Sequence, residues 1–282
     1  MSKSNVVVML LLRTLLVGAA VFGLFATAQA QSRIGVTQAV ENNPMGKPPG
    51  GVDRVLRVGT DVQANEIIST TNDDRAHVVF LDGTTLTVGP NSQMTIDKFV
   101  YDPTTQKGEL AVNATKGVFR VIGGRISKTA AITVTTPSST MGIRGGIMVF
   151  GVQASATTSI FVYGNSMTVT ANGITQTVTV PGLSVTTPTG GTPGTPTIVV
   201  QGNLSAALSA LVGTGNSQTA AATVLAIQTL VANNLGNAVT LQALIQAIIN
   251  VNAPSTLTTT LNTQLNVITV VENPNQTQAS PN

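Results

Sequence analysis

Between residues 52 and 188, short runs of apolar and β-branched residues alternate with turn residues at close intervals. Residues 77–81 lead into Asp82-Gly83, and residues 84–88 lead back. An Asp-Gly pair between two such runs predicts a hairpin, because glycine adopts positive φ without steric cost. The same pattern predicts further strands at residues 94–101, 109–112, 117–122, 131–135, 159–163, 167–170, 175–180 and 183–188. Met94, Ile96 and Phe99 are expected on the buried faces.

Strands this short and this evenly spaced are typical of a sandwich, a barrel or a coiled β-solenoid, and not of alternating βαβ units. Residues 183–188 partly repeat the sequence of residues 132–137, which fits a coiled arrangement. Periodicity alone does not choose among these architectures. We therefore predict a mainly β domain, solenoid-like or sandwich, over residues 52–188, preceded by a flexible segment at residues 31–51.

The composition changes after the β pattern ends. Residues 189–197 are rich in Gly, Pro and Thr and predict a linker. Residues 198–272 carry Ala, Leu, Ile and Gln at helical spacing, which predicts a small α-helical C-terminal region, and residues 273–282 a disordered tail. No Asp, Glu, Lys or Arg occurs between Arg144 and Glu272. Two readings stay open: a helical subdomain packed against the β domain, or self-association through the uncharged helices.

The first thirty residues have the pattern of an export signal. Lys3 and Arg13 are basic, residues 15–26 are apolar, and Ala28-Gln29-Ala30 matches a cleavage site. We expect cleavage after Ala30, a periplasmic or extracellular location, and no stable transmembrane span afterwards; the alternative is an uncleaved anchor. Without Lys3 and Arg13, 12 basic and 11 acidic residues remain, a net charge of +1. This balance, with no arginine cluster among aromatic residues, argues against nucleic-acid binding.

Few residues suited to catalysis or metal binding are present. The chain has no cysteine, which excludes disulfides, thiolate metal sites and cysteine nucleophiles. His77 is the single histidine, and we expect it to be a half-exposed strand residue. No nucleotide-binding or hydrolase motif occurs, and the aspartates lack the spacing of a calcium loop. We therefore expect no catalytic residues, no metal, no cofactor and no enzymatic activity.

Four motifs in sequence order resemble the FecR domain: residues 82–91, 96–103, 115–120 and 136–146. The resemblance covers roughly residues 53–187 and is to the exported, stand-alone members common in Gram-negative bacteria. Many members have Gly-Thr after the arginine, where this chain has Gly145-Gly146. The resemblance does not imply an anti-sigma role. We expect too few residues before the apolar leader to form the cytoplasmic segment that the family's namesake has.

The last motif contains the candidate binding residues Pro137, Gly142, Ile143, Arg144, Gly145 and Gly146, while Asp82 and Gly83 are expected to form a structural turn. Glycines on both sides of Ile143-Arg144 permit unusual backbone geometry, and the arginine fork suits carboxylates and carbonyls. We predict that Arg144 is a buried clamp on Asp82, Asp97 or strand-end carbonyls. The alternative is that it binds an anionic ligand.

These observations favour an exported, non-enzymatic binding or scaffold module of the cell envelope. Its partner would be an envelope protein or polymer that the sequence does not identify. A second interpretation, from a different class, is a signal-anchored periplasmic sensor component of a regulatory system.

Overall fold

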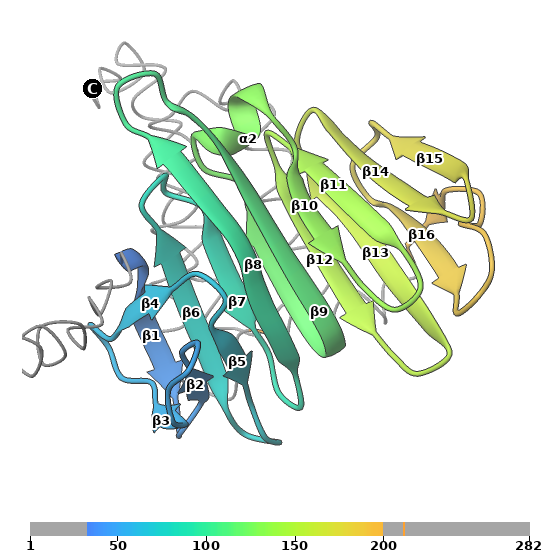
Figure 1. Cartoon of the computed structure of the whole chain (residues 1–282). Helices are drawn as coiled ribbons and strands as arrows, with labels where there is room; N and C mark the ends of the chain where they lie inside the picture. The colour runs from blue at the N-terminus through green and yellow to red at the C-terminus, as the bar shows by residue number, and fades with distance from the viewer. Residues whose placement is uncertain (1–32, 200–210, 212–282) are drawn as a thin grey trace, which may run out of the picture. The chain divides into compact units, whose positions relative to one another are not determined.

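The computed structural model describes residues 33–199 and Leu211 (Figure 1). The chain divides into two units, Met1–Ser32 and Arg33–Asn282, and all described residues belong to the second. The predicted export signal, its cleavage site, nearly all of the predicted helical region and the tail lie outside the described residues. In the part of the chain that is described, no helix is long and apolar enough to cross a membrane.

Seventeen strands and one short helix are described. In chain order they are β1 (Arg33–Glu41), β2 (Met45–Lys47), β3 (Arg54–Val55), β4 (Asp61–Gln63), β5 (Ile67–Ser69), β6 (Arg75–Phe80), β7 (Thr85–Val88), β8 (Gln93–Asp102), β9 (Lys107–Ile122), α2 (Ile126–Thr129), β10 (Ile132–Thr135), β11 (Thr140–Arg144), β12 (Ile147–Val152), β13 (Ala156–Tyr163), β14 (Ser166–Ala171), β15 (Ile174–Val178), β16 (Leu183–Pro188) and β17 (Thr197–Ile198). The prediction of a mainly β fold is confirmed.

Backbone pairing connects these strands into one continuous sheet that is folded into two layers. Layer A contains β1, β4, β6, β7, β12, β13, β16 and β17. Layer B contains β2, β3, β5, β8, β10, β11, β14 and β15. Strand β9 joins them, because residues 107–116 pair in layer B and residues 117–122 pair in layer A. Gly117, with φ of 107°, allows this bend, and a Cβ there would overlap Ser92.

From β10 onward, successive hairpins alternate between the layers. The β10–β11 and β14–β15 hairpins lie in layer B, and the β12–β13 and β16–β17 hairpins lie in layer A. Each hairpin pairs with the previous one in its own layer, β14 with β11 and β16 with β13. The chain therefore advances along the domain while it crosses back and forth between layers, which combines features of a sandwich and of a coil.

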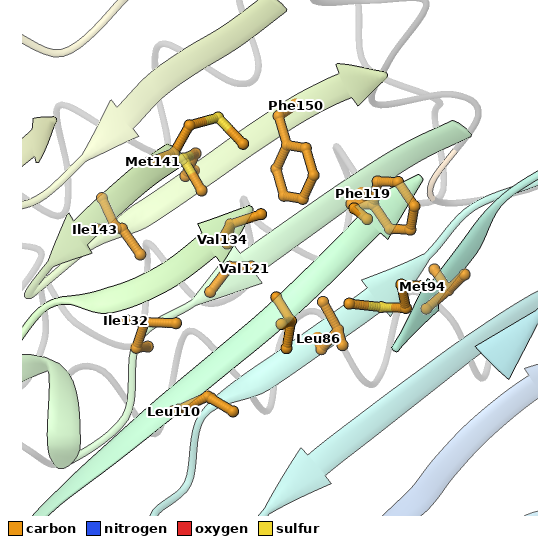
Figure 2. Close-up of a cluster of buried hydrophobic side chains, with 14 of the residues drawn as sticks. Leu86, Met94, Leu110, Phe119, Val121, Ile132, Val134, Met141, Ile143 and Phe150 are labelled. Atoms are coloured by element: carbon orange, nitrogen blue, oxygen red, sulfur yellow. The ribbon is translucent and has the colours of Figure 1, made fainter. Parts of the chain in front are cut away.

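One apolar core fills the space between the layers. Phe119 of β9 and Phe150 of β12 stack with ring centroids 5.0 Å apart. Figure 2 shows side chains of layer B, Val134 and Met141 among them, in the same cluster as these rings. Met94 and Ile96 are buried as predicted, and Phe99 packs partly buried against the core. Alternating side chains of both layers thus supply the burial that holds together a domain without disulfides.

The N-terminal boundary of the domain was predicted too late in the chain. The expected flexible segment at residues 31–51 contains β1 and β2, so that prediction is wrong for residues 33–47. Strand β1 pairs with both β4 and β6, and Ile34 is buried. The stability of β1 therefore comes from strands farther along the chain.

Two further boundaries differ from the predictions. The separate strands expected at residues 109–112 and 117–122 are parts of β9, because the chain continues through residues 113–116 and bends at Gly117 without a break in the strand. The expected linker at residues 189–197 folds back onto layer A. Thr189 N donates to Ser155 O at 2.9 Å, Gly194 N donates to Thr186 O at 3.0 Å, and Thr197 lies in β17.

Candidate functional site

Three connections between the layers meet at one end of the domain. They follow β9 (residues 123–131), β11 (residues 145–146) and β13 (residues 164–165). Backbone hydrogen bonds join them: Gly123 N to Gly146 O at 2.8 Å, Gly145 N to Ser127 O at 2.9 Å, and Asn165 N to Arg144 O at 3.1 Å. We call this region the crossover end.

Close packing explains the glycines of the last sequence motif, against the backbone of the crossover end for Gly146 and against the Thr168 side chain for Gly142. A Cβ at Gly146 would overlap the carbonyl oxygen of Tyr163, and Gly145 has a φ of 55°. A Cβ at Gly142 would lie 2.7 Å from Thr168 Oγ1. Ile143 is fully buried in the core. These four candidate residues therefore have structural roles that follow from packing alone.

Asp82 fastens the β6–β7 hairpin to the crossover end. Its buried carboxylate accepts hydrogen bonds from Thr84 N at 3.0 Å, Thr84 Oγ1 at 2.7 Å and Ile126 N at 3.1 Å, and its carbonyl accepts one from Arg125 N. Burial raises the pKa of Asp82, and the hydrogen bonds from Thr84 and Ile126 oppose that rise. Gly83 has a φ of 84°, so the predicted turn is confirmed, and Asp82 also anchors α2.

Arg144 is exposed, so its predicted role as a buried clamp is wrong. Met141 and Ile143 of β11 face the core, and strand alternation turns Arg144 outward. The carboxylate of Asp82 is occupied by Thr84 and Ile126. Asp97 is exposed on β8. The alternation was readable from the sequence, and it outweighs the argument from flanking glycines.

Two further cations lie at the crossover end with Arg144. Arg125 immediately precedes α2 and Lys128 lies within it, while the bond from Gly145 N to Ser127 O brings the end of β11 beside this helix. Burial and then the positive charge of Arg125, three residues earlier in the chain, lower the pKa of Lys128. We call Arg125, Lys128 and Arg144 the basic cluster.

No carboxylate forms an ion pair with the basic cluster within the described residues, and the Asp82 carboxylate nearby is bonded to Thr84 and Ile126. The ion pairs found among the described residues are formed by other cations: Arg33, Lys47, Arg54, Arg75 and Lys98. Between residues 110 and 199 the sequence has five cations and no Asp or Glu, while all ten described carboxylates lie at or before Glu109. The cluster therefore presents three cations without an ion-pair partner among the described residues at the crossover end. This separation of charges is visible in the sequence, but it does not distinguish Arg125 and Lys128 from Lys116 and Arg120.

Pro137 lies apart from the other candidate residues. It is exposed in the turn between β10 and β11, at the opposite end of β11 from Arg144. Buried hydroxyls hold this turn: Ser138 Oγ donates to Thr157 Oγ1 at 2.6 Å, and Thr157 Oγ1 donates to Thr136 Oγ1 at 2.9 Å. The structure therefore divides the motif of residues 136–146 into a hydroxyl-braced turn and the crossover end.

His77 is fully buried, in contrast to the half-exposed position that we expected. Its Nδ1 lies 3.0 Å from Thr87 Oγ1, which also accepts a hydrogen bond from Arg120 Nη2 at 3.0 Å. Burial, followed by the charges of Arg120 and Arg75, lowers the pKa of His77 to about 3. The imidazole is thus neutral at physiological pH and enclosed in the fold. Within the described part of the chain, no group of three His, Asp or Glu side chains could hold a metal ion.

Residues 66–168 match the model of the FecR protein family. The chain carries a FecR domain. The matched segment runs from just before β5 into β14 and includes Asp82 and the whole basic cluster. The resemblance to the FecR domain inferred from the four sequence motifs is confirmed for residues 66–168.

Two solved structures of a candidate anti-sigma factor from Parabacteroides distasonis align with the FecR-containing chain. Their sequence identities are 15% and 14%, and the TM-scores are 0.36 and 0.37. Each alignment covers 45% of this chain and 57% of the other, so this chain spans little more than half of their length. A comparison with curated proteins gave no match.

Proposed function

We propose that this protein is an exported, non-enzymatic binding or scaffold module of the cell envelope. In this proposal the FecR domain recognises an anionic polymer through the basic cluster. The observation that carries the proposal is that Arg125, Lys128 and Arg144 all belong to the crossover end, where Gly145 N bonds to Ser127 O, and that none of them forms an ion pair among the described residues.

The electrostatics of Lys128 support an anionic ligand. Its pKa is lowered because burial and the charge of Arg125 both disfavour a second positive charge. An anion bound between the cations would offset this repulsion, so binding should raise the pKa of Lys128. The free protein keeps these charges together because the surrounding fold fixes their backbones.

Rigidity of the crossover end also favours recognition. Gly145 and Gly146 hold Arg144 at a fixed point through the bonds to Ser127 and Gly123. A preformed cluster loses less conformational entropy on binding than cations carried on a loose loop. The guanidinium of Arg144 can contact a phosphate or carboxylate with two parallel hydrogen bonds.

Binding of fluorescently labelled polyphosphate and poly-glutamate, followed by anisotropy, tests the proposal and separates phosphate from carboxylate recognition. Arg144→Gln should weaken binding of the preferred polymer about tenfold, the loss expected for one strong charge-assisted contact. Added salt should weaken binding of the wild type.

Lys116→Gln is the matched control for Arg144→Gln. Lys116 is also exposed, and it lies on β9 nine residues from Lys107, or about 30 Å along the strand. Gly108, beside Lys107, packs near Ile126 of α2, so Lys116 lies far from the basic cluster. The control should bind like the wild type. Equal loss in both variants would mean that net charge, and not this cluster, determines binding, and the proposal would fail.

A second candidate function is a signal-anchored periplasmic sensor component, which the FecR domain favours. Cell fractionation distinguishes the two candidates. Retention in the inner membrane would support the sensor component, whereas recovery from the periplasm or the medium would support the exported module.

A further inference from the structure

Strand β15 forms the outer edge of layer B. Among the described residues it pairs with β14 alone, and Figure 1 shows it at the end of the domain away from β1, β3 and β4. An edge strand presents backbone N–H and C=O groups that can pair with another strand. Proteins commonly protect such edges with charges, prolines, bulges or very short strands.

The opposite end of the domain has these protections. Strands β3 and β4 are only two and three residues long. Asp61 of β4 pairs with Arg33, and Arg54 of β3 pairs with Glu66 at 2.9 Å. Strand β15 has the sequence Ile-Thr-Gln-Thr-Val, with no charge and no proline, and its ladder with β14 has no bulge. The two ends of the same domain therefore differ in how they resist pairing with another chain.

The turn before β15 determines which backbone groups are open. Asn172 and Gly173 have φ values of 47° and 76°, the geometry of a two-residue hairpin turn of type I′. Ala171 and Ile174 are therefore a hydrogen-bonded pair. Because such pairs alternate along the ladder, Gln176 and Val169 form the next hydrogen-bonded pair. The N–H and C=O groups of Thr175 and Thr177 consequently point away from β14, toward the open side.

The side chains of β15 also leave the core incomplete at this edge. Ile174, Gln176 and Val178 lie on the core side of the strand, opposite Ala171, Val169 and Met167 of β14. Val178 is buried, whereas Ile174 is 48% exposed at the end of the row. Thr175 and Thr177 lie on the outer face, where Thr175 Oγ1 is 2.8 Å from Thr170 Oγ1. No charged residue occurs between 145 and 199 to repel an identical edge.

We propose that β15 pairs antiparallel with β15 of a second copy of this chain, about a two-fold axis through Gln176. In this register Thr175 exchanges both backbone hydrogen bonds with Thr177 of the other copy, which matches the open groups on each. Ile174 then lies opposite Val178 of the other copy, so the exposed isoleucine extends the core row. The strand is self-complementary about its centre, which favours a closed dimer over pairing with an unrelated strand.

Sedimentation or light scattering of the full chain tests the dimer. Thr175→Pro removes an N–H that β14 does not use, so the fold should persist while the dimer dissociates to monomer. Thr177→Lys should also give monomer. Thr168→Lys is its matched control, because Thr168 is the cross-strand partner of Thr177 on the same face but one strand inside the edge. This control should remain dimeric.

A single introduced cysteine tests the register, since the chain has none of its own. At the two-fold axis, the two Gln176 Cα atoms form a non-hydrogen-bonded pair about 4.5 Å apart, within the range of a disulfide. Gln176→Cys should therefore form a disulfide-linked dimer under mild oxidation. Ile174→Cys lies on the same strand and face, but its copies would be about 14 Å apart and should not crosslink.

Three results would overturn the proposal. One is a monomeric wild type at all concentrations measured. Another is a dimer that Thr175→Pro and Thr177→Lys leave intact, which would place self-association elsewhere, as in the predicted C-terminal helices. The third is equal crosslinking of the two cysteine variants, which indicates collision without a defined register.

Discussion

Replacing Asp82 by alanine should cost more stability than any surface substitution in the domain. The carboxylate is 1% exposed and accepts hydrogen bonds from two backbone N–H groups, Thr84 and Ile126, and from the Thr84 hydroxyl. Alanine leaves these donors without their acceptor. An unsatisfied buried donor costs about 1–3 kcal/mol, so loss of the two N–H acceptors alone predicts about 2–6 kcal/mol. Urea unfolding followed by circular dichroism measures this change.

Asp102→Ala is the matched control, because the turn after β8 repeats the same chemistry at the surface. Asp102 accepts hydrogen bonds from Thr104 N and Thr105 Oγ1, both at 2.8 Å, but it is exposed. Water can replace the lost acceptor there, so the free energy of unfolding should change little. If Asp82→Ala is no more destabilising than Asp102→Ala, the Asp82 carboxylate does not anchor α2 to the hairpin. The argument that these buried hydrogen-bond donors require an acceptor is then refuted.

Three other predictions test the core, the crossover end and the burial of His77. Phe150→Ala, at a fully buried position, should lower the free energy of unfolding, measured by urea unfolding, by about 3–5 kcal/mol. A loss below about 1 kcal/mol would contradict one apolar core shared by the two layers. Gly146→Ala should lower the free energy of unfolding by about 3 kcal/mol or more, because its Cβ would overlap a backbone oxygen. Gly151→Ala should lower it far less, because the nearest neighbour of its Cβ would be 3.8 Å away. Similar losses in the two variants would argue against close packing at the crossover end. The pKa of His77 is lowered from 6.5 to about 3 in the folded protein, so the neutral ring contributes its full stabilisation above pH 6.5. This contribution to the free energy of unfolding is lost as the pH falls toward 3. Its NMR resonances should stay constant from pH 8 to 4.5, and a midpoint near 6.5 in the folded protein would show that the ring is accessible.

Local chemistry explains what could be predicted from the sequence. The Asp82-Gly83 turn needs only a positive φ between two apolar runs, so the hairpin was predictable. The burial of Met94 and Ile96 likewise follows from alternation within one strand. Arg144 shows that the same local rule extends to the candidate site, since alternation along β11 already directs it outward.

Nonlocal contacts explain what could not be predicted. Strand β1 is ordered by pairing with β4 and β6, which follow it by tens of residues, and no local pattern reports those partners. The burial of His77 is also not predictable from its own strand, because its neighbours across the sheet, Thr87 and Arg120, belong to β7 and β9. Residues 109–112 and 117–122 were predicted as two strands, but Lys116 pairs with Gln93 in layer B and Gly117 pairs with Val152 in layer A, so they form one bent strand.

The central claim is that Arg144 is displayed for recognition and does not hold the fold together. Thermal unfolding and polyanion binding of Arg144→Gln, measured on the same preparation, test this claim most directly. The exposed position predicts a melting temperature within about 2 °C of the wild type, since surface substitutions usually change stability by less than 0.5 kcal/mol. Binding of the polyanion should fall about tenfold. A melting temperature lowered by several degrees with unchanged binding would contradict the claim and restore the structural clamp.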